Sequence, residues 1–426
     1  MAVGLAAAGE REGGGFLGWR ILAVAVATAI LTGPGQTIGV SVFIDPMVAA
    51  LGVSRSAVST AYLIGTLTGA SAMPLFGRFV DRRGIRLAQT AAGLAFGLAL
   101  INMAGVRNAI WLTVGFAGIR MMGQGALSMI TSVTVSLWFD RRRGVTMGIL
   151  ATVGGAGIVA VPLVLDAVIS ATSWRTAWLI AGLTVMVTVI PLGWFGLVDR
   201  PSDVGQHPDG RAPKRSAAGA AQSSPPDRPV DSYTRSEAMR TTQFWMLAAV
   251  STVTGMLVTA LNFHQIDLLG EAGLSSGEAA AMFLPQIVGS SVMGISVGYV
   301  IDRIGVRFVP AFAMLCLIAV HLLGASMQPG LVVFAYAVAL GATGGASRAA
   351  LATMLPGYFG TAHIGSISGV MTVSGVAGSA VGPVTLALVE DRLGSYQSAN
   401  LALLVLPVLT MLFTLTNRPL PERSRR

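Results

Sequence analysis

The stretch that decides the fold is Gly77-Arg-Phe-Val-Asp81-Arg82-Arg83-Gly84-Ile85-Arg86, and a close copy of it is Gly298-Tyr-Val-Ile-Asp302-Arg303-Ile-Gly305-Val-Arg307. The two copies begin 221 positions apart, and each is a short charged segment between two long apolar runs. Glycine, aspartate and arginine occupy the same places in both. A repeated charged turn of this kind predicts a duplicated bundle of membrane helices.

The composition excludes a soluble globular protein. Of the 426 residues, 53% are hydrophobic and only 11% are charged, whereas soluble domains carry about 25% charged residues. The net charge of +9 comes from basic residues clustered between apolar runs, which is typical of membrane topology and not of a nucleic-acid surface. A single cysteine and four scattered histidines exclude a disulfide framework and give no metal-ligand spacing. We therefore expect no metal, no cofactor and no nucleic-acid partner.

Apolar runs of about 20 residues, long enough to cross a bilayer, occur twelve times: 21–44, 58–76, 87–106, 110–134, 144–169, 174–196, 243–263, 277–301, 307–327, 330–354, 365–390 and 396–416. The predicted organisation is an N-terminal tail (1–16), a six-helix bundle (17–197), a flexible linker rich in Pro, Ser, Asp and Arg (198–240), a second six-helix bundle (241–418) and a C-terminal tail (419–426). The chain is expected to be an all-α membrane protein.

The distribution of basic residues predicts the orientation. Of 28 Lys and Arg residues, two lie inside predicted spans, Arg120 and Arg348, and four lie on the side opposite the termini: Arg55, Arg107, Arg175 and Arg392. The rest lie on the side of both termini and the linker. By the positive-inside rule, these three segments are cytoplasmic, and the protein is a multi-pass component of the cell (inner, plasma) membrane.

The repeat extends well beyond the charged turn. Under the same offset, Gly148 aligns with Gly369 and Pro162 with Pro383. With a shift of one further residue, Phe-Ile-Asp45 aligns with Gln-Ile-Asp267. This pattern resembles the major facilitator superfamily over essentially the whole chain. The resemblance implies twelve transmembrane helices in two pseudo-symmetric bundles around a central cavity, alternating access by rocking, and a monomeric functional unit in the lipid bilayer.

In that family the duplicated turn is a cytoplasmic latch. The resemblance implies that Asp81 pairs with a basic residue of the segment Arg141-Arg142-Arg143. The gating residues predicted in this way are Gly77, Asp81, Arg82, Arg86, Arg141, Arg142, Gly298, Asp302, Arg303 and Arg307. The alternative is that the charges only fix topology and are solvated.

Three shorter stretches are similar to the monocarboxylate-transporter branch and its bacterial oxalate/formate relatives. They are Gly13-Gly-Gly-Phe16-Leu-Gly-Trp19, Trp138-Phe139-Asp140-Arg-Arg-Arg143-Gly144 and Arg200-Pro-Ser-Asp-Val-Gly205. The chain differs from that branch in its eighth predicted span (277–301), where Ser290 and Gly294 stand in place of an acid and an arginine. It also has no lysine in its first predicted span (21–44).

Arg120 and Arg348 are the main substrate-binding candidates. A charge inside a span costs about 2.5–3.5 kcal/mol on insertion scales and therefore needs a reason. By the repeat register Arg348 aligns with Leu127 and Arg120 with Gly341, so the two are not symmetry mates. Two cavity cations favour a small organic anion, because guanidinium matches carboxylate. Alternatively, Arg120 belongs to a helix 4 motif, ending in Gln124-Gly-Ala, in which arginine tunes proton coupling, and Arg348 snorkels to the interface.

Uncharged polar residues extend the candidate site. Gln36 and Thr37 follow the Pro34-Gly35 break, where freed backbone groups can bind a ligand. Tyr62 and Gln286 complete the substrate candidates, with a kink or packing role as the alternative. The candidates for proton coupling are Gln124, His264 and Asp267, although the last two can equally belong to an exposed rim.

The predicted function is secondary active transport of a small organic anion, in particular a monocarboxylate, with proton-coupled symport as one mode. The alternative is a drug/proton antiporter, which would be expected to carry an acid in the cavity. A receptor or scaffold on the same fold is a third hypothesis. No nucleophile–base pair, metal spacing or phosphate loop predicts an enzyme.

Overall fold

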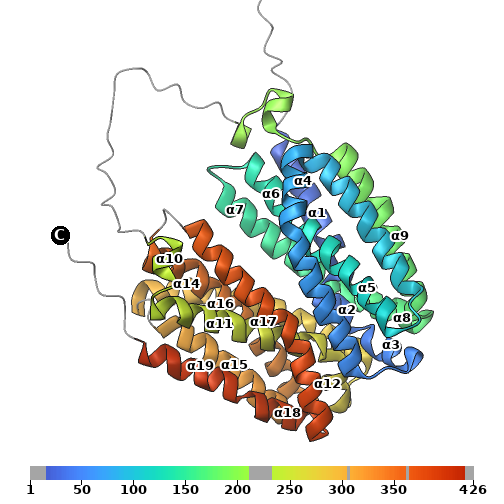
Figure 1. Cartoon of the computed structure of the whole chain (residues 1–426), viewed down its shortest axis with the longest axis vertical. Coiled ribbons are helices and arrows are strands. Elements are labelled where there is room, and N and C mark those ends of the chain that lie inside the picture. The colour runs from blue at the N-terminus through green and yellow to red at the C-terminus, as the bar shows by residue number, and fades with distance from the viewer. Residues whose placement is uncertain (1–15, 211–232, 305–307, 361–363, 418–426) are drawn as a thin grey trace, which may run out of the picture.

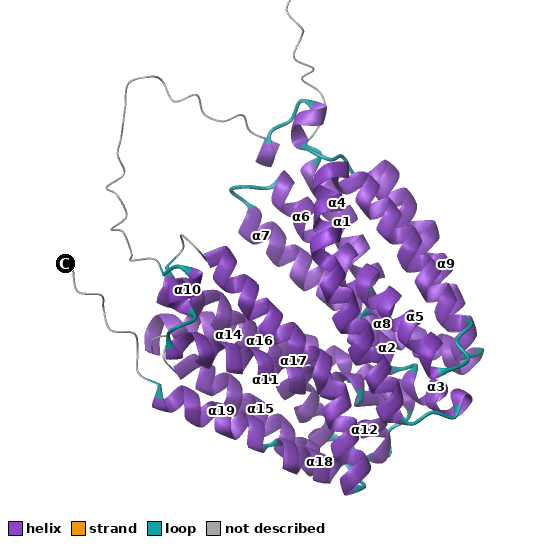
Figure 2. Ribbon diagram, viewed as in Figure 1, coloured by secondary structure: helices purple, strands orange, loops and turns teal. Residues whose placement is uncertain are grey.

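The computed structural model describes residues 16–210, 233–304, 308–360 and 364–417, and within these ranges it consists of helices and loops without a strand (Figure 2). The predicted gating residue Arg307 lies outside the described residues. The side chains of Asp81, Asp302 and Arg303 are likewise outside the described ones, so the predicted latch pairing stays a prediction.

The first half and the segment that follows it contain, in chain order, α1 (Gly18–Leu31), η1 (Gly33–Gly35), α2 (Thr37–Ser41), α3 (Ile44–Leu51), α4 (Arg55–Ala104), α5 (Ala109–Ile119), η2 (Arg120–Leu127), α6 (Ser128–Trp138), α7 (Arg143–Ile149), η3 (Leu150–Gly154), α8 (Gly155–Ala171), α9 (Trp174–Pro191), η4 (Leu192–Gly196), η5 (Pro201–Val204) and η6 (Pro208–Gly210).

The second half contains α10 (Arg235–Ala238), α11 (Thr242–Phe263), α12 (Gln265–Glu271), α13 (Ser276–Ala281), α14 (Phe283–Ile304), α15 (Val309–Ala325), α16 (Leu331–Phe359), α17 (Ile364–Leu393), α18 (Tyr396–Leu403) and α19 (Val405–Thr416).

Eight helices of the described part are long and apolar enough to cross a membrane, two of them within α4 on either side of residue 81. The other predicted spans fall on α1 to α3, on α5 to α6, on α14 and on α15. Two of these are interrupted for local reasons. Gly33-Pro34-Gly35 forms a 3₁₀ turn, because proline cannot donate to the helical ladder. Residues Arg120–Leu127 form a π-helix, a rare conformation frequent at functional sites.

The helices form two groups that meet at one end and diverge towards the other (Figure 1). We call the end that holds α3, α12 and α18 the closed end, and the end that holds η6 and α10 the linker end. Helices within a group pack closely where glycine lets backbones approach. A Cβ added at Gly341 of α16 would lie 1.9 Å from the carbonyl oxygen of Gln286 in α14, for example.

The first copy of the charged stretch, residues 77–86, is bound by residues at the end of the sixth span. Gly84 has φ 81° and ψ 166°, a region essentially restricted to glycine. Asp199 accepts a hydrogen bond from the backbone N–H of Arg86 at 2.9 Å. The Arg86 side chain donates to the carbonyl of Trp194 at 2.6 Å and lies 4.6 Å from the centre of its ring. Gly84 and Arg86 therefore fix the turn between the second and third spans to the end of the sixth.

Two of the three short stretches that are similar to the monocarboxylate branch pack together at the linker end. The ring of Phe16 lies 6.2 Å from that of Trp138 and 5.6 Å from that of Phe139. Asp209 accepts hydrogen bonds from the backbone N–H groups of Asp140, Arg141 and Arg142. Burial acts to raise the pKa of Asp209, but these backbone donors hold it below its ordinary value. The start of the predicted linker is thus ordered and hydrogen-bonded to the turn between α6 and α7.

Replacing Gly84 by alanine should destabilise the protein. The added Cβ would lie 2.3 Å from Oδ1 of Asp199, and the backbone conformation alone costs a non-glycine residue about 1–3 kcal/mol. We expect the thermal-unfolding midpoint of the detergent-purified protein to fall by a few degrees.

The matched control is Gly77→Ala in the same stretch, because a Cβ there meets nothing within 4 Å. It should leave the midpoint unchanged or raise it slightly, since alanine favours a helix. Equal midpoints for the two variants would contradict the role given to Gly84.

Candidate functional site

Two neighbouring cavities contain Arg348 in their walls. One, of about 560 Å³, lies among α11, α16 and α17 within the second half. The other, of about 740 Å³, lies between the halves and is bounded by η3 and α8 on one side and by α11, α14 and α16 on the other. Their size is suited to a small-molecule ligand. Arg348 therefore occupies the point shared by a cavity between the bundles and one inside the second bundle.

Arg348 is exposed to this space and is held by a hydroxyl group. Its Nη2 donates a hydrogen bond to Oγ of Ser290 on α14. None of the described residues that line the two cavities is acidic, so the guanidinium keeps donors available for a ligand. Its position in the walls of two cavities favours a ligand-binding role over snorkelling to the membrane interface. The arginine of α16 and the serine that stands where the branch carries an acid form one polar site.

Hydroxyl and amide side chains surround this cation. Thr254 and Ser347 are hydrogen-bonded to each other at 3.1 Å in the cavity within the second half. Asn262 lines the cavity between the halves, and its buried Oδ1 has no hydrogen-bond partner among the described residues. The sequence analysis missed these three residues, since a lone Ser, Thr or Asn in a span carries no distinguishing signal.

Gln286 also lines the cavity between the halves. Its Nε2 donates to Oε1 of Gln265 at 2.6 Å, and Gln265 donates in turn to the carbonyl of Ala279 at 3.0 Å. The amide is thus oriented by a chain of hydrogen bonds reaching α13, and part of its capacity is already used.

Arg120 lies elsewhere, packed inside the first half and not in the walls of either cavity. Only 4% of it is exposed. Its Nε donates to Oγ1 of Thr66 at 3.1 Å, and its Nη1 donates to the carbonyl of Gly35 at 3.3 Å. The broken helix supplies this carbonyl, which an unbroken helix would have used internally.

Two of the remaining first-half candidates, Thr37 and Tyr62, contact Arg120. The guanidinium lies 4.6 Å from the centre of the Tyr62 ring, and the Tyr62 hydroxyl is hydrogen-bonded to Thr37 at 2.7 Å. Gln36 turns back to donate to Thr32 at 3.0 Å, which favours its role in the helix break. Gln124 has a buried Oε1 without a partner among the described residues. The predicted substrate residues therefore divide into an Arg348 group and an Arg120 group.

An ion-pair cluster joins the two halves at the closed end. Arg55, at the start of α4, donates to Oδ1 of Asp45 at 2.6 Å and to Oδ1 of Asp267 on α12. Beside it Ser56 donates to Asp391 of α17. We call Asp45, Arg55 and Asp267 the clamp. The two aspartates are the repeat partners noted in the sequence, so one arginine lies between symmetry-related acids.

Asp267 is the titratable centre of this clamp. Burial raises the pKa of its carboxyl above the ordinary value, although the charge of Arg55 opposes the rise. Asp45 and Glu271 add negative charge nearby and also raise the pKa. A proton on Asp267 removes both its attraction to Arg55 and the cost of burying its charge.

His264 does not belong to an exposed rim, as one interpretation of the sequence had it. It is 1% exposed, because the turn from α11 to α12 folds it against α17 and α18. Its Nε2 donates to the carbonyl of Pro383 at 2.9 Å, and its Nδ1 lies 3.2 Å from the Tyr396 hydroxyl. The Asp267 side chain is partly exposed and belongs to the clamp, so its role in proton coupling stays a prediction.

Comparison with known sequences gives partial matches to transporters. The chain is 27% identical over 180 residues to the oxalate:formate antiporter of Oxalobacter formigenes (41% of this chain, 42% of that protein). It is 26% identical over 136 residues to human monocarboxylate transporter 14 (32% of this chain, 26% of that protein). It is 24% identical over 164 residues to the uncharacterized MFS-type transporter YcxA of Bacillus subtilis (strain 168), covering 37% of this chain and 39% of that protein. The chain spans less than half the length of each of these relatives.

Comparison with solved structures covers nearly the whole chain. A bacterial homolog of the human lysosomal transporter Spinster, in an inward-facing and occupied conformation, matches with a TM-score of 0.72 at 14% identity, over 95% of this chain and 97% of that one. The nucleoside transporter NupG matches with a TM-score of 0.73 at 11% identity, over 94% of this chain and all of that one. The profile of the major facilitator superfamily matches residues 24–383. The predicted fold class is thereby confirmed, and the chain belongs to the major facilitator superfamily.

Proposed function

We propose that this protein transports a small organic anion, in particular a monocarboxylate, by alternating access. The observation that carries the proposal is Arg348, a cation in a cavity whose described lining holds no acid. An arginine placed in a membrane protein without a fixed counter-charge is costly, and an anionic substrate would supply that charge.

The surroundings of Arg348 favour a carboxylate. The planar guanidinium can bind two carboxylate oxygens at once, and Ser290 orients it from one side. Neighbouring hydroxyls from Thr254 and Ser347 can donate to a hydroxyl or keto group on the same substrate. The rest of the lining includes valine, leucine and methionine, which suits a short apolar body.

The partial relatives support this substrate class. One is named for oxalate and formate and one for monocarboxylates, and all of these are small carboxylates. The nucleoside transporter NupG shares the fold only. The drug/proton antiporter is the weaker alternative, because a cationic drug would meet Arg348 and no acid in the described lining.

We further propose that both termini and the linker are cytoplasmic and that the closed end faces outward. The charge distribution of the sequence supports this orientation. The cavity between the halves would then be reached from the cytoplasm in this conformation, while the clamp holds the outer side shut. Transport requires the clamp to separate and re-form in each cycle.

Replacing Arg348 by glutamine should abolish carboxylate transport. Loss of a charge-assisted pair costs about 1.5–3 kcal/mol, so we expect at least a tenfold fall in uptake of labelled lactate, pyruvate, formate or oxalate into proteoliposomes. Arg348→Lys should retain part of the activity, because the charge stays while the fork is lost.

Arg107→Gln is the control, since Arg107 is an exposed arginine outside both cavities. It should transport like the unaltered protein. The proposal fails if the unaltered protein moves none of these carboxylates, or if Arg348→Gln moves them at the normal rate.

Replacing Asp267 by asparagine should open the closed end. Spin labels at the exposed positions Ala50 and Gln397, in a Cys316→Ser background, lie on α3 and α18 of opposite halves. Pulsed dipolar spectroscopy should show the distance distribution moving to longer values in Asp267→Asn.

The matched control is Glu278→Gln, which removes an exposed carboxylate of α13. An equal opening there would refute a specific role for the clamp.

A further inference from the structure

Arg120 is a buried cation that the Arg348 cavity does not explain. Its hydrogen bonds go to the Thr66 hydroxyl, to Thr37 and to the Gly35 carbonyl, all neutral acceptors. No described acid forms an ion pair with it. Asp81, whose side chain is not described, is 15 residues along α4 from Thr66, about 22 Å at the helical rise. A desolvated guanidinium without a counter-charge is an incomplete arrangement.

Three irregular features of the first half converge on this cation. The 3₁₀ break at Gly33–Gly35 presents a free carbonyl to it. Arg120 itself opens the π-helix of residues 120–127, and such segments are frequent at functional sites. The Tyr62 ring covers the guanidinium and its hydroxyl binds Thr37. Two departures from regular helix and an aromatic cover therefore meet at one charge.

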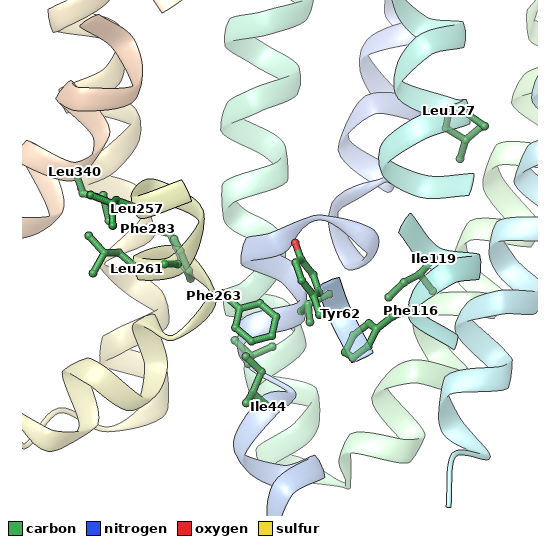
Figure 3. Packing of buried hydrophobic residues seen from close by; sticks show 14 of the residues in the cluster. Ile44, Tyr62, Phe116, Ile119, Leu127, Leu257, Leu261, Phe263, Phe283 and Leu340 are labelled. Atoms are coloured by element: carbon green, nitrogen blue, oxygen red, sulfur yellow. The ribbon is translucent and has the colours of Figure 1, made fainter. Parts of the chain in front are cut away.

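The cover over Arg120 is a contact between the halves. The ring of Tyr62 lies 4.6 Å from that of Phe263, which comes from α11 of the other half, and Figure 3 shows the two rings facing each other. This contact lies on the closed-end side, where the clamp residues Arg55 and Asp267 also join the halves. Separation of the clamp would withdraw Phe263 from Tyr62.

We propose that Arg120, Thr37, Thr66 and Tyr62 form a second carboxylate-binding site, closed here by the Tyr62–Phe263 contact and exposed when the clamp opens. This proposal rests on the proposed function, since it assigns the same substrate class to two arginines reached from opposite sides. Arg120 receives the anion from the clamp side, and Arg348 holds it on the linker side.

The test is equilibrium binding of labelled pyruvate to the purified full-length chain in two backgrounds, clamp intact and Asp267→Asn. With the clamp intact, Arg348→Gln should weaken binding at least tenfold and Arg120→Gln less than threefold. In Asp267→Asn, Arg120→Gln should weaken binding at least tenfold, since a charge-assisted pair is lost. Arg107→Gln should change neither. Failure of the unaltered protein to bind any carboxylate would refute the proposed function itself.

A second measurement does not depend on altering Arg120. In the Cys316→Ser background, a cysteine at the buried Thr66 should react with a methanethiosulfonate reagent only after Asp267→Asn, and pyruvate should protect it. A cysteine at Thr372, an exposed residue that lines a cavity of Arg348, should react with the clamp intact. The proposal is overturned if Thr66→Cys stays unreactive in Asp267→Asn, if pyruvate gives no protection, or if Arg120→Gln leaves binding unchanged in both backgrounds. A changed pH optimum with unchanged pyruvate affinity would assign Arg120 to proton coupling and would also overturn it.

Discussion

Contact between the two halves at the closed end depends on the clamp. In the clamp, the guanidinium of Arg55 binds one carboxylate from each half. Asp45 and Asp267 are repeat partners, so Arg55 lies where the pseudo-two-fold relation brings equivalent acids together. A single cation between them neutralises repulsion that would otherwise drive the ends apart. While it holds, Tyr62 meets Phe263 and the space around Arg348 is bounded at the closed end.

Placing a charge in an apolar medium is costly, and this cost indicates that the two arginines inside predicted spans have a role. A charged residue inside a span has to be paired, hydrated or functional. Arg348 lies in a cavity and is oriented by Ser290, whereas Arg120 is enclosed by hydroxyls, a carbonyl and an aromatic face. The same residue type thus occurs once in an accessible and once in a sealed setting. This difference is the basis for proposing an anion-binding arginine on each side of the barrier.

Much of this arrangement could be predicted from the sequence, because apolar runs and a repeated charged turn are local signals. The helix break at Pro34 and the location of Arg120 and Arg348 within the helical bundles followed from chemistry that single residues carry. The sequence did not predict which candidates lie together, since Thr37 and Tyr62 contact Arg120 and not Arg348, and only packing determines that. The clamp was partly visible as the repeated aspartates, but Arg55 counted only as a topology charge. Asp199 and Asp209 act through backbone N–H groups, and such contacts leave no mark on the sequence.

Structure determination of the protein with pyruvate bound, by electron cryo-microscopy in a lipid nanodisc, tests the central claim most directly. With the clamp closed, the account predicts carboxylate density within hydrogen-bonding distance of the Arg348 guanidinium, next to Ser290. Density for the ligand remote from Arg348, or a cavity that stays empty at saturating pyruvate, would contradict it.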